Sequence, residues 1–138
     1  MGNARVLTVV LTVLAYVVAT FAVQATSHFA INADHYRTIT FLRDRPIFAF
    51  GVLSMVVQGT VFGLLFPVFS GGRPTIRGGL LFSWILGAFL ASYIVLGESG
   101  KYAVPSVASW IRVELLAAAV QFSLFGLLLG LVHRGRSA

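Results

Sequence analysis

The chain has no cysteine among its 138 residues. That absence excludes disulfide bonds, thiolate-bound zinc, iron–sulfur clusters and cysteine nucleophiles together. Charged residues are also scarce, since they make up 10% of the chain and only four of them are acidic. An active site built from thiols or from several carboxylates therefore has very few residues to draw on.

Clustered positive charge is missing as well. The ten Lys and Arg residues give a formal net charge of +6, but they are scattered singly along the polar segments. Nucleic-acid binding depends on a concentrated basic patch, so we expect no nucleic-acid partner. Scattered basic residues beside apolar segments are typical of proteins that contact anionic lipid headgroups.

Long apolar runs account for most of the chain. Four of them cover residues 6–26, 46–69, 79–96 and 110–132, and each is close to the ~20 residues that a membrane-spanning helix requires. We interpret the first as a membrane helix, because it is long for a signal-peptide core. The sequence predicts an all-α fold: an integral membrane four-helix bundle of up-down topology with short loops, forming a single domain over residues 1–138.

The connections carry turn and cap signals. The longest, 27–45, mixes aromatic and charged residues, so we expect it at the membrane interface, with a short helix opened by Asn32 or Asp34. Asp44 is a candidate cap for a second helix that starts at Pro46. A short Gly/Pro turn over 70–78 predicts that the second and third spans are antiparallel neighbours.

The fourth span should open at Ser106, a plausible N-cap. The count of basic residues does not set the orientation, because the ten divide five and five between the two sides of the predicted bundle. We expect the plasma (inner) membrane with both termini cytoplasmic, since the basic residues on the terminal side lack acidic neighbours.

An even number of spans places the first and third loops at the same end of the bundle. That end collects every acidic residue and two histidines, in the set His28, Asn32, Asp34, His35, Asp44, Glu98, Lys101, Arg112 and Glu114. On a continuing helix, His28, Asn32 and His35 would share one face. Ordinary interfacial hydrogen bonding is the favoured interpretation, and a metal or proton-relay site completed by a glutamate is the alternative.

Arg112 and Glu114 fall inside the fourth apolar run. A charge at the bilayer centre costs ~3 kcal/mol or more, but at this shallow depth an arginine can reach the headgroups. We favour an interfacial ion pair, in which Glu114 is bound by Lys101 or Arg112. The alternative is an ion, proton or substrate site at the mouth of the bundle.

Gln58 and Gln121 lie near the midpoints of their spans, and we expect them to form interhelical hydrogen bonds, with each other or with other groups. Small residues recur at spacings of four and offer faces for close helix packing, within the monomer or against a partner helix. These are Gly59, Gly63, Ser83, Gly87, Ala91, Gly126 and Gly130.

Three function classes remain open. The first is a non-catalytic accessory, scaffolding or assembly subunit that packs against a larger membrane complex. The second is a small homo-oligomeric transporter or channel, with Glu114, Arg112, Gln58 and Gln121 as pathway residues. The third is a membrane enzyme using His28, His35 and a carboxylate. The sequence holds no HExxH or phosphate-loop motif, so we expect no cofactor, and the expected partners are lipid and other membrane subunits or a second copy.

Overall fold

The computed structural model describes residues 2–43 and 45–134. Four long helices dominate it: α1 (Asn3–Thr26), α3 (Phe48–Phe69), α4 (Ile76–Ser92) and α6 (Val107–His133). With their short extensions, four helices of this described part are long and apolar enough to cross a membrane. The prediction of an all-α, four-span membrane bundle is confirmed.

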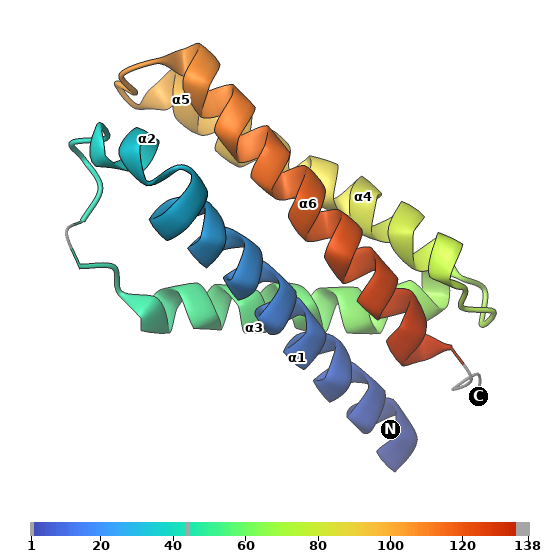
Figure 1. Cartoon of the computed structure of the whole chain (residues 1–138). Helices are drawn as coiled ribbons and strands as arrows, with labels where there is room; N and C mark the ends of the chain where they lie inside the picture. The colour runs from blue at the N-terminus through green and yellow to red at the C-terminus, as the bar shows by residue number, and fades with distance from the viewer. Residues whose placement is uncertain (1, 44, 135–138) are drawn as a thin grey trace.

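Shorter helical turns extend two of the long helices at the same end of the bundle (Figure 1). Helix α1 continues into a π-helical turn, η1 (Ser27–Ile31), which leads to the short helix α2 (Ala33–Arg37). Helix α4 continues likewise into η2 (Tyr93–Glu98) and α5 (Ser99–Lys101). Helix α2 is a short helix in the first loop, where the sequence predicts one, although the Asn32 amide donates to Ser27 Oγ (3.0 Å) instead of capping it.

Helices α1 and α6 form the centre of the arrangement, because α1 packs along α3 and α6, and α6 packs along α1 and α4 (Figure 1). The expectation that the second and third spans are close neighbours is wrong over most of their length. Helices α3 and α4 meet chiefly where three α3 rings, Phe62, Phe66 and Phe69, contact the ring of Phe82.

The tight turn between α3 and α4 is present as predicted. Gly71 and Gly72 have φ values of +57° and +74°, a conformation that glycine adopts without strain. The Thr75 hydroxyl then accepts a hydrogen bond from the Gly78 amide (2.9 Å) and caps α4. A short turn fixes only the ends of two helices, so it leaves α3 free to lie against α1.

Glycines bring the helices together. A Cβ added at Gly59 would lie 2.9 Å from the Cα of Val13 on α1, and one at Gly79 would lie 2.5 Å from the carbonyl oxygen of Gly126 on α6. Gly87 leaves room for the ring of Phe122. The predicted small residues therefore face other helices of the same chain, and the shape of α3 around Gly59 explains its preference for α1.

A dry aromatic core fills the half of the bundle nearer the chain termini. Its buried members are Tyr16, Ala19, Phe62, Phe66, Phe82, Phe122, Phe125 and Leu129. The Tyr16 ring stacks on Phe62 and meets Phe125 edge-on at 4.7 Å between centroids.

Two cap predictions have different outcomes. The Ser106 hydroxyl accepts a hydrogen bond from the Ser109 amide (3.3 Å), so Ser106 caps α6 as expected. Helix α3 begins at Phe48, so Pro46 precedes the helix and does not occupy its first turn. The predicted cap Asp44 lies outside the described residues.

Candidate functional site

The first and third loops meet at one end of the bundle. The Tyr36 hydroxyl donates a 2.7 Å hydrogen bond to Oε1 of Glu114, and the Ser109 hydroxyl lies 3.1 Å from Nδ1 of His35. The indole N–H of Trp110 donates to the carbonyl of Ile94 in η2 (3.1 Å). The loops that carry the predicted set therefore meet at one end of the molecule, as the parity of the spans predicts; Asp44 of that set lies outside the described residues.

The two histidines do not form a ligand set. The His28 ring stacks on Tyr36 at 3.6 Å, and its Nδ1 lies 3.0 Å from the Gln24 carbonyl oxygen. In the described part of the chain, no three His, Cys, Asp or Glu residues lie close enough to hold a metal ion. The continuing helix on which a common face of His28, Asn32 and His35 depended is not present, because the π turn η1 ends at Ile31 and α2 begins at Ala33.

Three other predicted residues sit at the periphery of this end. Asp34 pairs with Arg37 at 2.7 Å on the exposed surface, and the Lys101 ammonium lies 5.2 Å from the Tyr102 ring centre. Glu98 is half-buried and close enough to Glu114 for their negative charges to repel.

The predicted ion pair of Glu114 with Lys101 or Arg112 is wrong. Within the described residues, Arg37–Asp34 is the only ion pair. Residues two apart on a helix point to different sides, and accordingly Glu114 lines an interior cavity while Arg112 lines a separate groove. Burial, and next the bonded Glu114 carboxylate, raise the pKa of the Tyr36 phenol above its usual range, so Tyr36 is a stable proton donor to Glu114.

The interior cavity has a volume of about 80 Å³ and lies among α1, α3, α4 and α6. Its polar lining comes from Tyr16, Gln24, Gln58, Glu114 and Gln121. A cavity of this size can hold water or a small ion. Glu114 is seven residues from the start of α6 and Gln121 fourteen, which places them about 10 and 20 Å along a helix about 40 Å long.

The two mid-membrane glutamines do not bond each other. The Tyr16 hydroxyl donates to Oε1 of Gln58, and Nε2 of Gln24 donates to Oε1 of Gln121 (2.8 Å). Both glutamines thus bond to α1, which holds α3 and α6 by polar contacts at mid-depth.

These contacts come from a polar stripe on α1 that the sequence interpretation missed. Every fourth residue is polar, from the second turn of the helix to η1: Thr8, Thr12, Tyr16, Thr20, Gln24 and His28. The first four are buried, and Thr12 Oγ1 lies 3.0 Å from Nε2 of His133 on α6. The detectable signal was the spacing itself, because residues four apart lie on one helix face.

The cavity adjoins the aromatic core on the side of the termini, since Tyr16 and Phe122 belong to both. Toward the opposite end lies Glu114, bonded to the interfacial Tyr36. The oxygen-rich lining offers a carboxylate, amide oxygens and a hydroxyl, which are the groups that hard cations prefer. Comparisons with known protein families, with curated proteins and with solved structures gave no match to this chain.

Proposed function

We propose that the protein transports a small cation across the membrane and that Glu114 is its binding carboxylate. One observation carries the proposal: Glu114, Gln58 and Gln121, three of the four pathway residues expected for a transporter, line the same interior cavity. The fourth, Arg112, faces elsewhere and has no place in the pathway.

Electrostatics supports a cationic substrate. No Lys or Arg of the described residues lies within ion-pair distance of Glu114. Glu98 is a second carboxyl group nearby, and Lys101 offsets part of its charge. A carboxylate at this depth in an apolar bundle is costly unless a proton or another cation neutralises it. The cavity therefore favours cations over anions.

Transport through this bundle requires a movement of the aromatic core. Tyr16, Phe62 and Phe125 are almost fully buried, and in this proposal they form the barrier between the cavity and the terminal end of the bundle. Transport then needs these rings to part, which makes the described arrangement one that is closed on the terminal side. Helix α3 is the natural mobile element, since it packs mainly on α1.

The proposal is tested with purified protein in liposomes under imposed gradients of H⁺, Na⁺ or K⁺, with ion-sensitive dyes as readout. We expect flux of one of these cations above that of protein-free liposomes, and a lower rate in Gln121→Leu. Absence of flux for all three cations, with the protein folded in the liposomes, would overturn the proposal.

A second candidate is an accessory or assembly subunit. The packing of α3 favours it, because the chain covers α3 mainly on its α1 side and leaves residues such as Phe50 and Val57 exposed. This proposal expects co-purification with other membrane subunits at fixed stoichiometry. A solitary monomer that carries out full cation transport would count against it.

The four spans make the chain an integral membrane protein. We further propose the plasma (inner) membrane with both termini in the cytoplasm, in keeping with the start of α1 and the end of α6, which lie at the same end of the bundle (Figure 1). A C-terminal fluorescent-protein fusion should then fluoresce, whereas an active C-terminal alkaline phosphatase fusion would place that end outside.

A further inference from the structure

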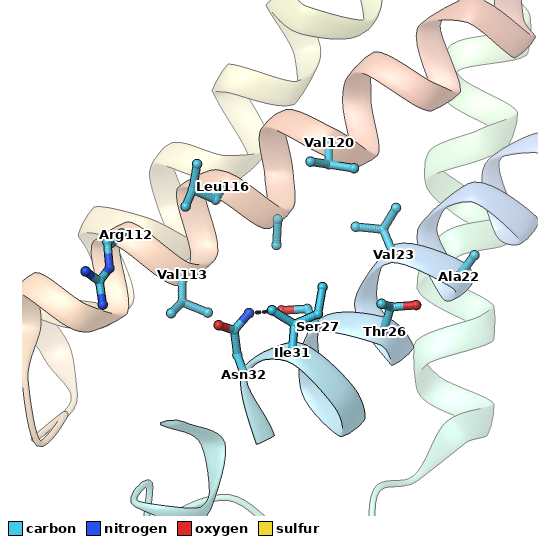
Figure 2. A pocket seen from close by; sticks show the side chains of 11 residues that line it. Ala22, Val23, Thr26, Ser27, Ile31, Asn32, Arg112, Val113, Leu116 and Val120 are labelled. Atoms are coloured by element: carbon cyan, nitrogen blue, oxygen red, sulfur yellow. Dashed lines mark hydrogen bonds between the residues drawn. The ribbon is translucent and has the colours of Figure 1, made fainter. Parts of the chain in front are cut away.

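A second hollow lies on the outside of the bundle, between α6 and the C-terminal part of α1 with η1 (Figure 2). Its volume is about 510 Å³, within the ~300–1,000 Å³ range of small-molecule sites. It is distinct from the interior cavity, since the two share no lining residue.

The groove is most polar at one end and largely apolar along the rest, where Thr26 is also part of the lining (Figure 2). Arg112 and Asn32 mark the polar end, while Val23, Leu116 and Val120 belong to the apolar walls (Figure 2). Arg112 is five residues from the start of α6 and Val120 thirteen, so the groove runs from about 7 to about 20 Å along the helix. Its polar end is at headgroup depth and its apolar part extends toward the bilayer centre.

The Arg112 guanidinium has no anionic partner in the described part of the chain, where the only ion pair is Arg37–Asp34. Its side chain is exposed. Guanidinium groups bind phosphate through two parallel hydrogen bonds. An unpaired arginine at headgroup depth above an apolar groove is complementary to a molecule with an anionic head and a hydrocarbon tail.

We propose that this groove binds one anionic phospholipid of the surrounding bilayer, with its phosphate at Arg112 and one acyl chain lying along the wall formed by Leu116 and Val120. The orientation of the groove matches that of a lipid in the leaflet at the loop end. The site is independent of cation transport, because it shares no residue with the interior cavity.

The test is native mass spectrometry of the purified protein with equimolar phosphatidylglycerol and phosphatidylcholine. We expect the wild type to retain one phosphatidylglycerol molecule. In Arg112→Gln, the preference for phosphatidylglycerol over phosphatidylcholine should be about fivefold lower. Arg112→Lys keeps the positive charge but loses the two parallel hydrogen bonds, so it should keep only part of the preference. The matched control is Arg37→Gln, which removes a paired arginine from the same end and should leave the preference unchanged.

Leu116→Trp tests the contact with the acyl chain separately. Leu116 is 61% exposed, so a larger side chain there narrows the groove without entering the core. We expect weaker retention of both lipids. Equal binding of the two lipids by the wild type, or an unchanged preference in Arg112→Gln, would overturn the proposal. A dimer that displaces the lipid would assign the groove to a second copy and would also overturn it.

Discussion

The hydroxyl of Tyr36 in α2 donates a 2.7 Å hydrogen bond to the carboxylate of Glu114 in α6, joining positions 78 residues apart. This bond attaches the first loop to the membrane bundle above the interior cavity. Tyr36 also packs with Ile39, Trp110 and Val113 in a small buried cluster. Because the acceptor is a carboxylate, the bond is stronger than one between neutral groups.

A double-mutant cycle measures that bond. Tyr36→Phe and Glu114→Ala, alone and combined, should show a coupling of ~1.5–3 kcal/mol in the free energy of unfolding, the usual value for a hydrogen bond to a charged group. Unfolding is followed by circular dichroism in mixed micelles. Tyr102→Phe, which removes an exposed hydroxyl, is the control and should change stability by less than ~0.5 kcal/mol. Additive single effects would show that the contact contributes nothing.

The raised pKa of Tyr36 predicts a dependence on alkaline pH. The folded state holds the phenolic proton more tightly than the unfolded state, so the resulting stabilisation is complete below the ordinary tyrosine pKa of ~10 and is lost as pH rises above it. Ionisation is measured as tyrosinate absorbance at 295 nm, and the absorbance of Tyr36→Phe is subtracted from that of the wild type. The difference should show no ionisation of Tyr36 at pH 10. Half-ionisation at that pH would contradict the buried contact with Glu114.

Close packing of α4 on α6 predicts that Gly79→Ala is destabilising. Its Cβ would lie 2.5 Å from the Gly126 carbonyl oxygen, and overpacking of this kind costs ~1–3 kcal/mol. Gly51→Ala is the matched control on α3, because its Cβ would meet nothing within 4 Å. That variant should be neutral or up to ~1 kcal/mol more stable. Equal effects of the two substitutions on thermal unfolding would refute the packing account.

The lack of native cysteine allows the cavity to be mapped with single thiols. In Gln121→Cys the thiol faces the polar cavity, whereas in Leu129→Cys it is buried in the aromatic core. A thiolate must be hydrated to react, so a small methanethiosulfonate reagent should modify Gln121→Cys faster. Similar rates for both variants would mean that the cavity is no wetter than the core.

The number of spans and the end at which each loop lies follow from length and parity, whereas the turn over 70–78 and the Ser106 cap follow from local residue types. Four apolar runs give four spans, and an even number of spans brings Tyr36 and Glu114 to the same end whatever the packing. Which helices touch depends on local shape instead. The backbone approach at Gly59 sets α3 against α1, and no turn signal over 70–78 contains that information.

The contacts within the candidate site depend on how the helices pack. The prediction of an ion pair for Glu114 treated neighbouring charges as partners, whereas the helix turns Arg112 and Glu114 to different sides. The four-residue spacing of the polar stripe on α1 indicates a shared helix face, but none of its residues indicates a contact by itself. Only packing shows that Tyr16 and Gln24 meet the glutamines of α3 and α6.

The most direct test of cation transport is the initial rate of cation flux into liposomes containing Glu114→Gln, compared with the same measurement on Asp34→Asn. Each variant removes one carboxylate from the same end of the bundle, but Asp34 is exposed and outside the cavity. We predict that flux is lost in Glu114→Gln and stays at the wild-type rate in Asp34→Asn. Wild-type flux in Glu114→Gln would contradict the assignment of Glu114 as the binding carboxylate.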